Sequence, residues 1–135
     1  MPDTVKRYTF RKPEKICNQN QIDGIFKDGK SFTSGQFRLI YLESEISDKP
    51  PVQVLIAIPK KSLRHAVTRN RMKRLIREAY RMNKHTIIEH YSSIAKHCDI
   101  AIVFNGKQCV SLDETVLAIN TLLVRLIKIH EKNSE

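Results

Sequence analysis

Two short aliphatic runs set the tightest limit on what this chain can fold into. Residues 52–58 (VQVLIAI) and 99–104 (DIAIVF) are rich in apolar and β-branched side chains, a pattern typical of strands inside a sheet. The segment between them has a long helical periodicity. The order strand, helix, strand indicates mixed α and β structure, and 135 residues suffice for one such domain with a hydrophobic core.

Periodicity and turn residues predict the remaining elements. Residues 45–51 contain two prolines and several polar residues, which cannot continue a ladder of strand hydrogen bonds, so we expect a loop there. The other expected elements are a helix over 19–27, a strand over 36–43 with a candidate strand at 30–34 before it, and a closing helix from Ser111 to about Lys132.

Both outer helices have recognisable cap residues. Asn18 or Asn20 can accept hydrogen bonds at the start of the first helix, and Gly29 stands where a left-handed residue would end it. Ser111 and Glu114 have the spacing of a capping box, in which each side chain accepts a hydrogen bond from the other residue's amide.

The positive charge is concentrated in one segment. The formal net charge is +10, and the stretch from Lys60 to Lys84 holds ten basic residues against the single acid Glu78. The rest of the chain is nearly neutral, with 14 basic and 13 acidic residues. A charge excess confined to one segment indicates a surface that binds a polyanion, because a charge that only improves solubility has no reason to be concentrated.

Helical geometry separates the apolar and basic residues of this segment onto two faces. At 100° per residue, the apolar arc contains Met72, Leu75, Ile76, Ala79 and Asn83, and the opposite face contains Asn70, Lys73, Arg74, Arg77, Arg81 and Lys84. Like charges one turn apart repel one another, so an external partner must favour this arrangement. Arginine outnumbers lysine in the helix, and a guanidinium donates paired hydrogen bonds to phosphate, which favours nucleic acid over a membrane surface.

The charge pattern fits more than one class of protein. One is a nuclease whose own side chains cleave the nucleic acid, and another is a structural RNA-binding or DNA-binding protein. The acids are scattered, and no arrangement of carboxylates, serine or cysteine indicates a catalytic site. We therefore expect no catalytic residue and no metal site on the protein. Asn70 is either a contact to a base or sugar or a residue at the start of the helix.

The stretch IPKKSLRHAVTRNRMKRLIREAYR, following a strand, resembles the bacterial ribonuclease P protein component. The residues that carry the resemblance are Lys60-Lys61, Ala66-Val67, Arg69-Asn70-Arg71 and Lys73-Arg74-Leu75-Ile76-Arg77-Glu78. It extends to 25–32, 36–42, 99–104 and the closing helix, and so covers about residues 10 to 130.

This resemblance implies an α+β sandwich, with a four-stranded mixed sheet, about three helices and the basic helix in a left-handed βαβ crossover. It implies that the chain acts as the protein subunit of ribonuclease P. From the residues themselves we expect a single RNA-binding domain over 1–135 and a flexible basic arm over 1–13, which is basic and unpatterned. The N-terminus lacks the pattern of a secretory signal, so we expect the protein in the cytoplasm. The partners would be the catalytic RNA and precursor tRNA, with no membrane and no obligate protein partner. The RNA would carry out hydrolysis of the 5′ leader with Mg²⁺ held mainly by RNA, and no organic cofactor would be needed.

The resemblance also assigns binding residues. Contacts to the catalytic RNA would come from Lys60, Lys61, Arg64, Arg69, Asn70, Arg71, Lys73, Arg74 and Arg77. A cleft between the first helix and the sheet would hold the single-stranded leader, lined by Ile22, Phe26, Arg38 and Ile40. Ile22 and Ile40 replace aromatic residues that are frequent in the family, and the alternative is that Ile22, Phe26 and Ile40 are core residues.

Overall fold

The structure is a computed structural model, and it describes residues 14–16, 18–45 and 50–133. Three helices and one four-stranded sheet follow one another as α1 (Gln19–Asp28), β1 (Lys30–Ser34), β2 (Phe37–Glu45), β3 (Val52–Ala57), α2 (Ala66–Ser93), β4 (Lys96–Phe104) and α3 (Leu112–Asn133). The expected α+β class, with a mixed four-stranded sheet, is confirmed. Within the described ranges, no helix is both long and apolar enough to cross a membrane.

The strands lie in the order β1-β2-β4-β3. Of these four, β4 is the one with both an antiparallel and a parallel neighbour. β4 runs antiparallel to β2 and parallel to β3. Because parallel neighbours cannot be joined by a tight turn, α2 makes the crossover between β3 and β4. The loop that follows β3 and the loop that follows β4 therefore emerge at the same end of the sheet.

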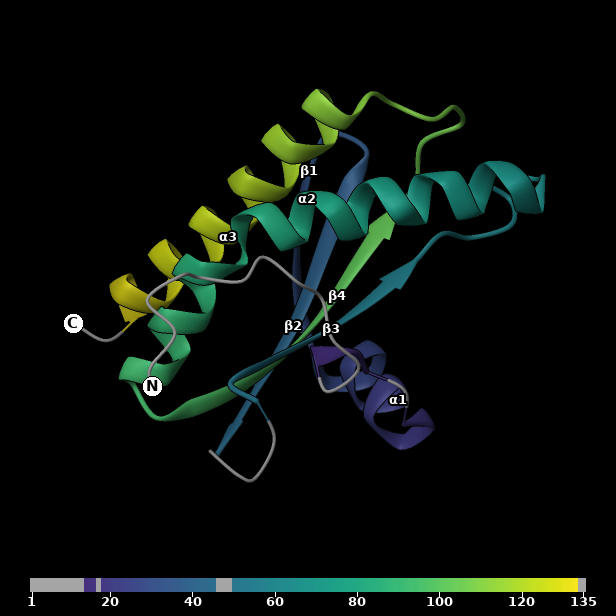
Figure 1. Ribbon diagram of the computed structural model, residues 1–135. Coiled ribbons are helices and arrows are strands. Elements are labelled where there is room, and N and C mark those ends of the chain that lie inside the picture. Colours follow the sequence, from purple (N-terminus) through teal and green to yellow (C-terminus); the bar gives the residue numbers. More distant parts are fainter. Residues whose placement is uncertain (1–13, 17, 46–49, 134–135) are drawn as a thin grey trace, which may run out of the picture.

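Helices cover both faces of the sheet, with α2 and α3 packed on one face and α1 on the other (Figure 1). The alternation along β2 explains how one strand serves both layers. Leu39 and Tyr41 join the larger core under α2 and α3, and Ile40 points to the smaller core under α1. Ile25 of α1 is fully buried against Ile40, Ala101 and Val103.

Two of the expected cap interactions are confirmed and two are wrong. The Asn18 carboxamide accepts hydrogen bonds from the amides of residues 20 and 21, and the Ser111 hydroxyl accepts one from the amide of Glu114. In the described residues, no reciprocal bond joins the Glu114 carboxylate to the Ser111 amide.

Gly29 has φ −70° and ψ 151°, so it is extended and not left-handed. A glycine is needed there for space, because a Cβ atom would lie 2.4 Å from the Ile25 carbonyl oxygen and 2.8 Å from the Ile40 side chain.

Candidate nucleic-acid interface

The loop between β3 and α2 is anchored at its centre and presents its cations outward. Leu63 is 3% exposed and packs in the larger core. The amides of Ser62 and Leu63 donate to the Pro59 carbonyl at 3.0 and 3.4 Å, which closes a tight turn. Lys60, Lys61 and Arg64 stand on either side of this anchor and are exposed.

Arg69 connects this loop to the helix. Its Nη1 donates to the carbonyl oxygens of Leu63 and Arg64, both at 2.9 Å, and the side chain is half-buried. Hydrogen bonds from a charged donor are stronger than neutral ones. Part of the Arg69 guanidinium therefore shapes the loop, a role that its place in the sequence motif did not predict.

The first half of α2 presents a continuous cationic face formed by Arg71, Arg74 and Arg77, with the neutral Asn70 beside them. All four side chains are exposed. Met72, Ile76 and Ala79 are fully buried on the opposite side, as the periodicity predicted. Among the described residues, no acidic side chain pairs with the three arginines of the cationic face. Lys73 is half-buried at its border.

Asn70 lies in the second turn of α2, because the helix begins at Ala66. The interpretation of Asn70 as a residue at the helix start is therefore wrong. Its exposed carboxamide is free to face a ligand together with the neighbouring arginines.

The cationic face ends in the middle of α2. Arg81 forms an ion pair with Glu78, and the hydrogen bond from Arg81 lowers the pKa of the Glu78 carboxyl. Lys84, expected on the basic face, is 4% exposed, and its Nζ lies 2.6 Å from a carboxylate oxygen of Glu14. That expectation is wrong because the second half of α2 buries a face rotated towards Tyr80, Ile87 and Tyr91.

The β3–α2 loop and the residues after β4 line an open pocket of about 580 Å³. It is lined by Lys61, Ser62, Leu63, Arg64, His65, Thr68, Lys107, Gln108 and Cys109. The pocket adjoins the start of α2, where the N-cap residue makes no side-chain cap bond and the first turn has no acid, so the positive end of the helix dipole is uncompensated.

Lys107 is a cation that the sequence analysis missed. Its Nζ donates to the Lys61 carbonyl oxygen at 2.9 Å, which places it beside the β3–α2 loop. No local pattern indicates this, because the two residues are 46 positions apart and meet only through the sheet.

The four residues predicted to line a leader cleft have different environments. Ile40 is 3% exposed in the smaller core, so the core alternative is the better interpretation there, and Ile22 packs half-buried against the same core. Phe26 is 50% exposed on α1. Arg38 is exposed on β2 and donates to the Ser31 hydroxyl at 3.1 Å.

The acidic, histidine and cysteine side chains of the described residues do not gather into a group of three or more that could hold a metal ion. Cys98 is buried, Cys109 is half-buried and both are free thiols.

Comparisons with known proteins agree with the sequence motif. The sequence profile of the family described as Ribonuclease P matches residues 10–125. The chain is 41% identical over 109 residues to the ribonuclease P protein component of Chlorobium phaeobacteroides, covering 73% of each chain. It is 30% identical over 119 residues to that of Porphyromonas gingivalis, covering 88% of this chain and 87% of the relative.

Among solved structures, the RNase P protein of Thermotoga maritima superposes with a TM-score of 0.63 at 25% identity, covering 83% of this chain and 96% of that one. The RNase P protein of Staphylococcus aureus superposes with a TM-score of 0.66 at 21% identity, covering 84% and 94%. The arrangement of three helices around a mixed four-stranded sheet is similar in these proteins.

Proposed function

The chain belongs to the ribonuclease P protein component family, and from this premise we propose that it is the protein subunit of a ribonucleoprotein that removes the 5′ leader from precursor tRNA. The catalytic RNA carries out the cleavage, and the protein binds both this RNA and the leader. The observation that carries the proposal is the cationic face of α2, whose arginines have no acidic partner among the described residues.

The catalytic RNA is bound by a surface that extends from the β3–α2 loop along the first half of α2. Arg64 precedes the helix, and Arg71, Arg74 and Arg77 follow along one face, so their guanidinium groups can reach successive phosphates. Lys107 extends this surface from the other side of the pocket at the start of α2. The salt slope is the decrease in log affinity for the RNA per unit increase in log salt concentration. Each phosphate contact should add about 0.7 to 0.9 to this slope.

The leader lies on the sheet face beside α1. Phe26 is half-exposed and offers an aromatic ring, and stacking on such a ring contributes about 1–3 kcal/mol per base. Arg38 is exposed on β2, two residues before Ile40 and so on the same face of the sheet, and supplies a cation for the leader backbone. Ile40 supports this surface from the core and does not contact the leader.

Magnesium is assigned to the RNA. The described acidic, histidine and cysteine side chains form no group of three or more that could hold an ion, and we assign no step of the cleavage to a protein-bound metal. The contribution of the protein is to bind, and to place the leader relative to the catalytic RNA.

Reconstitution with the organism's own catalytic RNA tests the proposal. Cleavage of precursor tRNA should require the RNA, and the protein should lower the magnesium concentration needed. The double variant Arg71→Ala/Arg74→Ala should weaken binding of the catalytic RNA and lower the salt slope by about 1.5. The matched control is Lys96→Ala/Lys27→Ala, which removes two exposed charges outside α2 and the loop before it.

Cleavage of precursor tRNA by nuclease-free protein without RNA would refute the proposal. Equal losses of affinity in the Arg71/Arg74 variant and in the control would refute the assignment of the cationic face. Preference for ribosomal RNA or duplex DNA over the catalytic RNA would favour the alternative of a different nucleic-acid-binding protein.

A further inference from the structure

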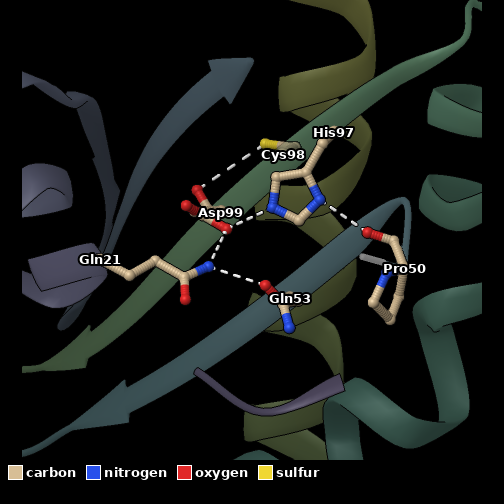
Figure 2. A network of polar contacts seen from close by, with 6 residues as sticks. All are labelled: Gln21, Pro50, Gln53, His97, Cys98 and Asp99. Atoms are coloured by element: carbon tan, nitrogen blue, oxygen red, sulfur yellow. Dashed lines mark hydrogen bonds and ion pairs between the residues drawn. The ribbon is translucent and has the colours of Figure 1, made fainter. Parts of the chain in front are cut away.

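A buried polar network joins α1 to the two parallel strands (Figure 2). His97 is 2% exposed, and its Nδ1 lies 2.6 Å from the Pro50 carbonyl oxygen. Its Nε2 lies 2.5 Å from Oδ1 of Asp99. The same Oδ1 accepts a hydrogen bond of 2.7 Å from the side-chain amide of Gln21, which also donates to Gln53 at 2.7 Å.

The partners of His97 determine how many protons it must hold. A carbonyl oxygen only accepts, so Nδ1 must carry a proton to bond to Pro50. A carboxylate also only accepts, so Nε2 must carry a second proton to bond to Asp99. With Asp99 as a carboxylate, the two hydrogen bonds therefore require a positively charged imidazolium.

The residues next to His97 on the adjoining strands and the α1 residue in the network carry uncharged side chains. Across the sheet, the residue paired with His97 on β2 is Ser44. The neighbouring groups from β3 and α1 are the uncharged amides of Gln53 and Gln21. Lys15, on the segment beside β3, pairs with Val54 and is exposed.

This network attaches α1 to the sheet by hydrogen bonds, and we call it the polar tether of α1. Among the described residues, Gln21 is the one α1 side chain with a hydrogen bond to the sheet, and its acceptors lie on β3 and β4. The other attachment is the apolar contact of Ile22 and Ile25 with the smaller core. Gln21 therefore links Asp99 directly to the helix that presents Phe26.

We propose that His97 is a positioning residue that makes the leader affinity of the ribonucleoprotein depend on pH. At low and neutral pH the imidazolium holds Asp99, which holds Gln21 and fixes α1. When the proton leaves, the ring can donate only one hydrogen bond. If Nδ1 keeps its proton for the Pro50 carbonyl, Asp99 loses the donor that holds it, and Gln21 then bonds to a carboxylate that is no longer fixed. This proposal rests on the proposed function, because it assumes that the leader lies beside α1.

The first test examines protonation in the protein alone and does not depend on RNA. Nuclear magnetic resonance of the ¹⁵N-labelled ring should show both nitrogens of His97 protonated at about pH 7.5, where an ordinary exposed histidine is mostly neutral. Exposed His65 is the internal comparison. A His97 ring with one unprotonated nitrogen at that pH would overturn the proposal without affecting the proposed function.

The second test measures the ratio of affinities for precursors with a long leader and with a one-nucleotide leader, in the reconstituted particle. The ratio cancels pH effects on the catalytic RNA. It should fall about two- to tenfold between about pH 6 and pH 9, as expected for the loss of one hydrogen bond. His97→Gln should give a low ratio that does not change with pH.

Two further variants separate positioning from folding. In Asp99→Asn the side-chain amide NH2 can donate to an unprotonated His97 Nε2. It can also donate to the Gln21 side-chain oxygen once the Gln21 and Gln53 carboxamides rotate by 180°. The affinity ratio should therefore stay high at every pH. His85→Gln, on α2, should retain the pH dependence of the unaltered protein. Equal pH dependence in the unaltered, His97→Gln and Asp99→Asn proteins would overturn the proposal. A ratio of one at every pH would overturn the leader assignment and this inference with it.

Discussion

Replacing Arg69 and Arg71 one at a time should separate loop support from phosphate binding, although both belong to the same sequence motif. Arg69 donates two hydrogen bonds at 2.9 Å to the carbonyls of Leu63 and Arg64, and its side chain is half-buried. Hydrogen bonds with a charged partner contribute about 1.5–3 kcal/mol each when buried, and less where water competes. We expect Arg69→Ala to lower the free energy of unfolding by about 1–3 kcal/mol.

Arg71 is exposed and has no acidic partner among the described residues, so Arg71→Ala should change stability by less than about 0.5 kcal/mol. Urea unfolding followed by circular dichroism measures both variants. In binding to the catalytic RNA, Arg71→Ala should lower the salt slope by about 0.7 to 0.9, as expected for one lost phosphate contact.

The two measurements together decide the interpretation. If Arg69→Ala were as stable as the unaltered protein, the two carbonyl contacts would not support the loop. If Arg71→Ala left the salt slope unchanged while weakening binding, its contribution would be something other than a phosphate contact. Either result would refute the division of roles.

Three further predictions concern the scaffold. Gly29→Ala should destabilise the protein by about 1–3 kcal/mol because its Cβ would collide with backbone, whereas Gly24→Ala, with no atom nearer than 3.9 Å, should stabilise the helix by about 0.5–1 kcal/mol in urea unfolding. Lys84→Met should lower the free energy of unfolding by about 2–4 kcal/mol, because its carboxylate partner stays largely buried; an unchanged urea midpoint would contradict this. A thiol reagent at mildly alkaline pH should label Cys109 and spare Cys98, since burial raises the pKa of the Cys98 thiol well above its usual value, and peptide mapping that finds equal labelling would contradict it.

Local sequence was enough for the elements and for the part of the cationic face that lies in the first half of α2. The aliphatic runs became β3 and β4, and Asn18 and the Ser111 hydroxyl accept the expected cap bonds, because these signals depend on residues only a few positions apart. The periodicity of α2 also predicted the burial of Met72 and Ile76. The family motif identified the RNase P RNA as the partner, whereas the charge alone indicated only that the partner is a polyanion.

The sequence alone failed where a residue's environment depends on a distant segment. A helical projection gives the angle of Lys84 but not what packs against it, and its ion pair with Glu14 spans 70 positions. For Ile40 the sequence left two interpretations, a cleft residue or a core residue, and the packing of α1 on the sheet shows that it lies in the core.

The amino-acid sequence by itself determined which residues form strands and helices, and that one face of a helix would carry unbalanced positive charge. Only the tertiary structure decided three other contacts. Arg69 donates to the β3–α2 loop, and Lys107 donates to the Lys61 carbonyl of the same loop. Asp99 contacts both His97 and Gln21. The physical reason is that periodicity and capping act within a few residues, whereas burial and hydrogen-bond partners are set by whichever segments the sheet brings together.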